Sequence, residues 1–118
     1  MSRSKITTAG RRSSRRGGVN LARMRRPPTH PGEILDKEFL EPLGRGAQTA
    51  AAARMGMSLN RLNEILIGKR GVSAESAVLI GALTGTDPRM WLGMQADFDL
   101  WHAMRAVDVA KIKPLKGD

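Results

Sequence analysis

Cysteine and tyrosine are absent from this 118-residue sequence, and its aromatic residues are limited to two tryptophans and two phenylalanines. Without cysteine the chain forms no disulfide, offers no thiolate ligand to a metal and has no cysteine nucleophile. Two histidines, His30 and His102, do not make up a zinc site, so we expect no metal and no cofactor. No apolar run approaches the roughly 20 residues that cross a bilayer, and we expect a cytoplasmic protein without a membrane partner.

Acidic residues are also missing from the first 26 positions, which hold nine of the 20 lysines and arginines. The other 11 cations are matched by all 11 acidic residues in 27–118, so the formal excess of +9 belongs to the N-terminal segment. Residues 1–26 are rich in Arg, Ser and Gly and bury too little apolar surface to offset their ordering entropy. This predicts a disordered tail that attracts nucleic-acid phosphates. Two alternatives remain open: Met24 is the true start, or the segment is a transit peptide.

The stretch from residue 46 to residue 72 predicts two short helices joined by a tight turn. The first covers about Ala47–Met55 and the second about Leu59–Ile67. Gly56 stands where the turn requires a positive φ, which glycine adopts without a Cβ clash. Ser58 follows as an N-cap residue. A helix, a glycine turn and a capped helix together are typical of a DNA-binding helix-turn-helix.

The second of these helices separates its residues by face. At 100° per residue one arc carries the apolar side chains of Leu62, Ile65 and Leu66. The other side carries amide and charged groups: Asn60, Arg61, Asn63 and Glu64. Asn can pair with adenine, Arg with guanine or phosphate, and Glu can accept from cytosine. This pattern favours a recognition helix, and an ordinary amphipathic surface helix is the alternative.

Three further helices are predicted, over about residues 32–41, 74–84 and 88–106. The first has an acidic outer face, which we interpret as solvated because no third ligand or nucleophile accompanies it. The last carries one apolar stripe, formed by Trp91, Met94, Phe98 and Trp101. We assign Trp91 to the core, and Phe98 and Trp101 to a dimer interface, because the stripe exceeds what so small a domain can cover. Residues 107–118 are a polar end.

Four segments together resemble the HigA/VapI antitoxin family, a group of helix-turn-helix proteins of the phage-repressor (Xre) type. They are THPGEIL, EFLEPLG, AQTAAAARMGMSLNRLNEILIGKRGVSAESA and DPRMWLGMQADFDLW. The resemblance covers about residues 27–105. It implies an all-α, five-helix, phage-repressor-like domain over residues 27–106 that forms a homodimer. It also implies a repressor of its own operon that binds a DNA palindrome and neutralises a HigB-like mRNA endonuclease toxin, and not an enzyme.

The resemblance also implies which residues contact DNA. Phosphates would be bound by Gln48 at the start of one helix and by Lys69 and Arg70 in the loop after the recognition helix. Ser58, Leu59 and Asn60 would occupy the base-reading start of the recognition helix, with Arg61 and Asn63 close by. Leu59 remains ambiguous, because it could complete the core edge or touch a thymine methyl.

The sequence departs from the family pattern at three places. Ala51 stands where the family usually has leucine, which predicts a looser contact between the helices of residues 47–55 and 74–84. Gly46 and Ala47 replace an apolar residue and threonine, which weakens the cap of the first of these helices, and Ile67 replaces a common asparagine. Two other functions stay open: a regulator of the same fold without a toxin partner, and an architectural DNA binder driven by the basic tail.

Overall fold

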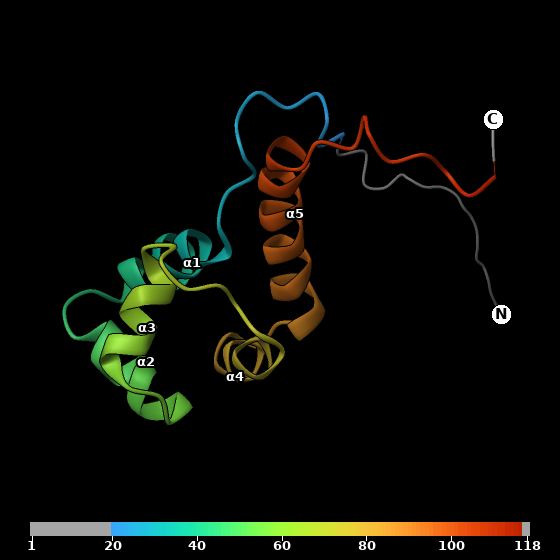
Figure 1. Ribbon diagram of the computed structural model, residues 1–118. Coiled ribbons are helices and arrows are strands. Elements are labelled where there is room, and N and C mark those ends of the chain that lie inside the picture. The colour runs from blue at the N-terminus through green and yellow to red at the C-terminus, as the bar shows by residue number, and fades with distance from the viewer. Residues whose placement is uncertain (1–19, 117–118) are drawn as a thin grey trace, which may run out of the picture.

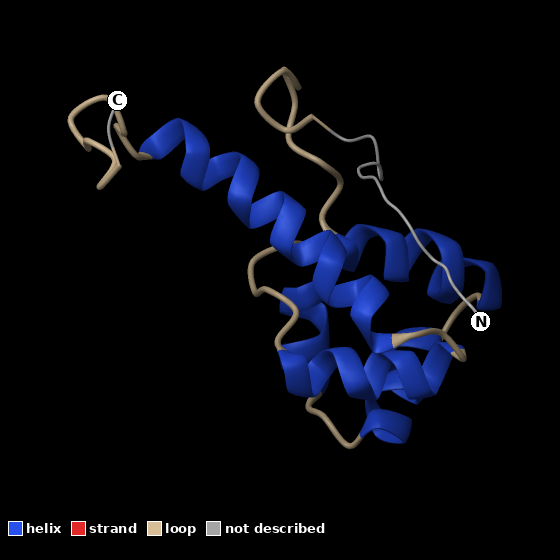
Figure 2. Cartoon of the chain, turned by 90° about the vertical axis from the view of Figure 1, so that its right-hand side faces the viewer, coloured by secondary structure: helices blue, strands red, loops and turns tan. Residues whose placement is uncertain are grey.

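A computed structural model describes residues 20–116, and within that range every regular element is helical (Figure 1). In chain order the elements are α1 Pro31–Ile34, η1 Leu35–Leu40, η2 Glu41–Leu43, α2 Ala47–Met55, α3 Leu59–Leu66, α4 Ala74–Thr84 and α5 Pro88–Ala106. The all-α prediction is confirmed. The C-terminal half of α5 projects from the bundle formed by the other helices (Figure 2). No helix in the described range is long and apolar enough to cross a membrane.

The first helical segment differs from the prediction of one α-helix over residues 32–41. After α1 the chain widens into a π-helical stretch, η1, and then tightens into the 3-10 turn η2. The backbone N–H of Glu41 donates to the carbonyl of Asp36, five residues earlier. Pro42 has no N–H, and in an α-helix its ring would clash with the carbonyl of Glu38. The change of helical pitch before Pro42 relieves that clash, and Gly44 then ends the segment with φ 86°.

The helix-turn-helix follows the predicted boundaries closely. Helix α2 has the predicted bounds, and α3 ends one residue earlier than expected. Gly56 ends α2 with φ 70°, and the Ser58 hydroxyl accepts a hydrogen bond from the N–H of Arg61 at 3.0 Å. Gly46 precedes α2 with φ 86° and offers no capping side chain, as its sequence predicts.

Local capping also fixes the last two helices. The Ser73 hydroxyl accepts from the N–H of Ser76 at 3.1 Å, and the Asp87 carboxylate accepts from the N–H of Arg89 at 2.9 Å. Trp91 is fully buried, which confirms its assignment to the core, and its indole N–H donates to the Thr86 hydroxyl at 2.6 Å. These caps set where α4 and α5 begin, and Trp91 fixes how α5 packs.

The core lies between the face of α3 that points inward and the helices around it. Its largest fully buried side chains include Leu35 of η1, Leu62 and Ile65 of α3, Ile80 of α4 and Trp91 of α5. This sharing of one core places α3 at a fixed angle to all of its neighbours, with its other face outward.

Helix α1 reaches this core through its backbone. A Cβ atom at Gly32 would lie 1.7 Å from the carbonyl oxygen of Ile65 and 2.6 Å from its carbonyl carbon. Only a residue without a side chain allows this approach. The glycine of the HPGEIL motif therefore seats α1 directly on the recognition helix.

Residues 20–26, which the sequence assigns to the basic tail, lie against the C-terminal half of α5. The N–H of Arg23 donates to the carbonyl of Asn20 at 3.2 Å, which closes a turn. The indole N–H of Trp101 donates to the carbonyl of Met24 at 3.0 Å. The rest of the tail that was predicted to be disordered, residues 1–19, lies outside the described residues.

Candidate nucleic-acid interface

The outward face of α3 carries the predicted base-reading residues. Ser58, Leu59, Asn60 and Asn63 are exposed, whereas Leu62, Ile65 and Leu66 of the same helix are buried. Within residues 20–116 the amides of Asn60 and Asn63 have no protein hydrogen-bond partner. Their donors and acceptors are thus open to an external ligand.

Leu59 and Ser58 begin this face. The Leu59 side chain is 45% exposed, so it lies at the surface and does not complete the core. The Ser58 hydroxyl is used by the helix cap. An apolar side chain beside two free amides can meet a thymine methyl next to an adenine edge.

Arg61 lies at the side of α3 and has a partner on the neighbouring helix. Its guanidinium donates to the Glu75 carboxylate in the first turn of α4 at 3.1 Å. The pair ties α3 to α4 and partly neutralises Arg61. Because the Glu75 side chain is 75% exposed, the bond is weak and can open to a phosphate or base.

The loop after α3 turns at Gly68 (φ 78°) and folds back on Glu64. The N–H groups of Lys69 and Arg70 donate to the Glu64 carbonyl at 2.8 and 3.1 Å. The Arg70 guanidinium binds the Glu64 carboxylate through two nitrogens, at 2.9 and 2.8 Å. Glu64 therefore has a protein partner and is not free to read cytosine. Lys69 is exposed without an ion pair in the described range, and it presents an unshared charge.

Gln48 is half-buried in the first turn of α2. Gly46 supplies no capping side chain, and the N–H of Ala47 donates to the carbonyl of Gly44 at 3.2 Å, so the N–H groups of Gln48 and Thr49 are left to meet an anion. The structure thus places Gln48, α3 and the loop with Lys69 and Arg70 on the same helix-turn-helix unit.

A buried glutamine, which the sequence reasoning missed, holds that loop in place. The Gln95 side chain of α5 accepts from the N–H of Val72 at 2.8 Å and donates to the Asp99 carboxylate at 2.9 Å. Gly71 passes so close that a Cβ atom there would lie 3.2 Å from the Gln95 amide carbon. A polar residue next to the apolar stripe of α5 was the available signal.

His30 caps α1 and connects three parts of the fold. Its Nδ1 accepts from the N–H of Gly32 at 2.9 Å, and its ring packs edge-on against Phe98 with centroids 4.9 Å apart. The ring also lies beside Gly68 of the recognition loop. Burial lowers the pKa of His30, which opposes the smaller upward effects of Asp99 and Glu33. The neutral imidazole is the form that accepts the capping hydrogen bond.

The two residues predicted for a dimer interface have partners within their own chain. Phe98 lies between the rings of His30 and His102. Trp101 is covered by Met24 and by the Arg105 guanidinium, whose carbon lies 3.8 Å from the indole centroid. No described element covers Leu100 (51% exposed) and Met104 (45%) on α5. Their i, i+4 spacing was a signal for an apolar face that the sequence analysis did not use.

The described residues contain no group of three or more His, Cys, Asp or Glu side chains placed to hold a metal ion. What the surface offers is an apolar side chain, two free amides and several cations around one helix. Such a set suits the edges of bases and the phosphates beside them.

Comparison with known proteins gives several similar chains, although no protein-family model matches. Virulence-associated protein I of Dichelobacter nodosus is 42% identical over 74 residues, covering 63% of this chain and 68% of that protein. Antitoxin HigA-1 of Vibrio cholerae is 37% identical over 98 residues, covering 80% and 90%. The solved structure of Pseudomonas aeruginosa antitoxin HigA with the higBA promoter aligns with a TM-score of 0.66 and 32% identity, covering 75% of this chain and 99% of that one.

Proposed function

This chain belongs to the HigA/VapI family of helix-turn-helix antitoxins, and from that premise we propose that it is a sequence-specific DNA-binding repressor of its own operon. The observation that carries the proposal is the outward face of α3, where Asn60 and Asn63 have free amides while the opposite face is locked in the core. A helix held in this way can enter a major groove without rearranging the domain.

In this proposal each predicted residue has a distinct task. Asn60 and Asn63 pair with base edges, and Leu59 contacts a thymine methyl. Phosphates on either side are bound by Gln48, Lys69 and Arg70, with Ser58 and Arg61 at the margin of the groove. Because Glu64 holds the Arg70 guanidinium, Arg70 approaches the backbone from a fixed position.

We further propose a symmetric homodimer that places two α3 helices in successive major grooves, about one helical turn (~34 Å) apart on a palindrome. Helix α5 supplies the interface, because its exposed Leu100 and Met104 form an apolar face that the monomer does not cover. At 100° per residue Trp101 lies at the edge of this face and Phe98 lies further round the helix. That Phe98 and Trp101 belong to the dimer interface stays a prediction.

Family membership supports a second partner, a HigB-like toxin that the protein neutralises in the cytoplasm. Co-expression with the neighbouring gene, followed by affinity purification, tests this part. A stable complex that suppresses the growth defect caused by the neighbour is expected. A neighbour that neither binds nor harms the cell would instead indicate a regulator without a toxin.

DNA reading is tested by fluorescence anisotropy with the protein's own upstream duplex and a scrambled duplex. We expect Asn60→Ala to reduce discrimination by about 1–3 kcal/mol at one base pair. Arg70→Ala should weaken binding to both duplexes alike. Arg89→Ala, an exposed cation at the start of α5, is the control and should change neither value. Equal affinity of the wild-type protein for both duplexes would overturn the proposal.

A further inference from the structure

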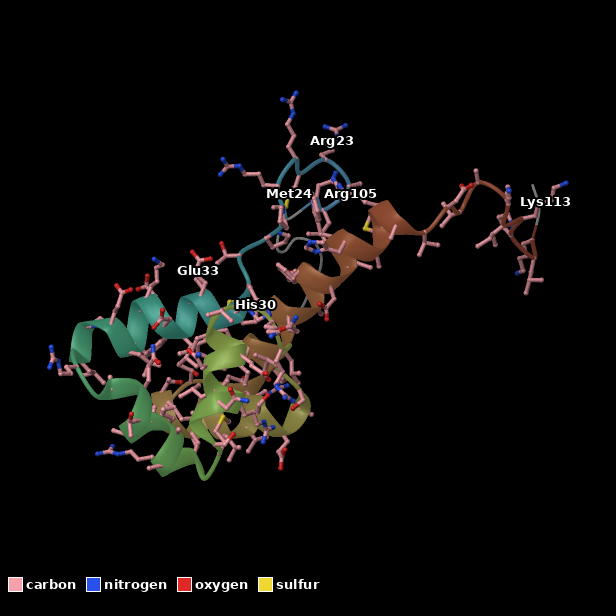
Figure 3. The ribbon with its side chains drawn as sticks, turned by 60° about the vertical axis from the view of Figure 1, so that its left-hand side comes forward. Arg23, Met24, His30, Glu33, Arg105 and Lys113 are labelled. Atoms are coloured by element: carbon pink, nitrogen blue, oxygen red, sulfur yellow. The ribbon has the colours of Figure 1, made fainter. Side chains whose placement is uncertain are left out.

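Residues 20–26, called the arm below, are bound to α5 through backbone carbonyls. The Arg105 guanidinium donates to the carbonyls of Leu21 at 3.4 Å, Ala22 at 3.5 Å and Met24. Trp101 adds its indole N–H to the Met24 carbonyl. One arginine and one tryptophan in the last two turns of α5 therefore hold three backbone carbonyls of the arm. Figure 3 shows Met24 beside Arg105.

The Arg105 guanidinium is suited to this task. Its planar group lies over the Trp101 ring while its N–H donors point to carbonyl oxygens at its edge. The carbonyls carry no charge, so the arm is held without any acidic residue. Backbone carbonyls of the arm face the helix, and its exposed arginine side chains are left for another partner.

Those side chains form a concentrated positive surface. Arg23, Arg25 and Arg26 are exposed, and none of them has an ion-pair partner within residues 20–116. Figure 3 shows Arg23 on the outer side of the arm, away from Arg105. The nearest acidic residue in sequence is Glu33, beyond the prolines that lead into α1. Three unshared guanidinium groups on a fixed backbone match a row of phosphates.

Chain connectivity places this surface near the recognition loop. Four residue steps separate Arg26 from His30, which span at most about 14 Å. The His30 ring in turn lies beside Gly68, directly before Lys69 and Arg70. The arm therefore ends no more than about 14 Å from the residue that packs on the recognition loop, a span over which the arm and the loop can contact one DNA segment.

We propose that the arm is a second, sequence-independent phosphate-binding surface for duplex DNA next to the site read by α3. Trp101 and Arg105 are its positioning residues. The inference rests on the proposed DNA-binding function, but it assigns to the arm the non-specific part of the affinity. Because the remainder of the chain is formally neutral, the arm and the residues before it supply the net attraction to a polyanion. Holding the backbone in advance lowers the ordering cost that each phosphate contact would otherwise carry.

The test compares three variants of the full chain on a non-operator duplex from 50 to 200 mM salt. One variant neutralises the arm (Arg23→Gln, Arg25→Gln, Arg26→Gln). The matched control removes the same charge from the segment that follows α5 in the chain (Lys111→Gln, Lys113→Gln, Lys116→Gln). The third releases the arm without changing charge (Trp101→Phe, Arg105→Lys). Circular dichroism checks that each variant is folded.

Neutralising the arm should lower the slope of log K against log salt by up to ~2.7, so that the loss of affinity over this range becomes roughly 40-fold smaller. The control should keep the wild-type slope. The third variant should keep the slope and bind about 3- to 10-fold more weakly, because the ordering cost returns at binding. Trypsin should also cut its arm faster than that of the wild-type protein.

Equal slopes for the arm and control variants would overturn the inference, as would tighter binding to single-stranded RNA than to the duplex. The operator preference of the wild-type protein is read in the same titrations. If that preference is absent while the arm still sets the salt slope, the base-reading proposal fails and the arm inference stands. If the preference is present and the arm has no effect, the reverse holds.

Discussion

Replacing Gly32 by alanine should destabilise the protein strongly, although alanine is the better helix former. The backbone of Gly32 lies outside the left-handed region, so conformation alone would favour alanine by about 1 kcal/mol. The new Cβ, however, would lie 1.7 Å from the Ile65 carbonyl oxygen, where real contacts are at least 3.0 Å. Overpacking against yielding side chains costs about 1–3 kcal/mol, and here the obstacle is backbone. We therefore expect a net loss of ~3 kcal/mol or more.

Gly93→Ala is the matched control, because it makes the same chemical change inside α5. No atom lies within 4 Å of a Cβ at Gly93, so this variant should gain about 0.5–1 kcal/mol. Urea unfolding followed by circular dichroism at one protein concentration measures both values, and the thermal midpoint of Gly32→Ala should fall by more than about 10 °C. A Gly32→Ala protein within about 0.5 kcal/mol of wild type would refute the backbone contact between α1 and α3.

Three further predictions concern single sites. Burial lowers the pKa of His30, so the unfolded state binds a proton at a higher pH than the folded state does, and the free energy of unfolding should fall as pH drops below about 6.5. His30→Asn keeps a capping acceptor but does not titrate. In urea melts this variant should therefore lose less stability between pH 7.5 and 5 than the wild-type protein. Ala51→Leu should raise the free energy of unfolding by about 0.5–2 kcal/mol, because an open groove lies beside Ala51 and can take the larger side chain. A lower melting midpoint would show that the groove cannot hold a leucine. Glu75→Gln should release the Arg61 guanidinium and strengthen DNA binding at low salt, while the free energy of unfolding changes by less than about 1 kcal/mol. Unchanged affinity in fluorescence anisotropy would show that the Arg61–Glu75 ion pair does not restrain Arg61.

The parts of the fold that the sequence predicted correctly depend on local chemistry. Ser58, Ser73 and Asp87 each accept a backbone N–H within three residues, so their positions alone mark where helices start. Gly56 likewise ends α2 through its own φ angle. The two faces of α3 followed from the helical period, because one side of that helix is fully buried.

The parts that the sequence did not predict depend on which elements meet in space. The pairing of Arg61 with Glu75 requires the angle between α3 and α4, and the bond from Gln95 to Val72 spans 23 positions. Met24 lies 77 positions from Trp101, and the helical period of Trp101 gives no sign of this partner in the N-terminal segment. The π-helical stretch arises from Pro42, a residue that sequence rules use only to end a helix.

The two tryptophans make the protein its own optical reporter. Trp91 is fully enclosed, whereas Trp101 lies half-exposed beneath a guanidinium at the far end of the same helix. With no tyrosine in the chain, the ultraviolet emission comes from these two indoles, and the emission of each one depends on a different structural change. Detachment of the N-terminal segment should alter the emission of Trp101 while that of Trp91 stays constant until the bundle melts.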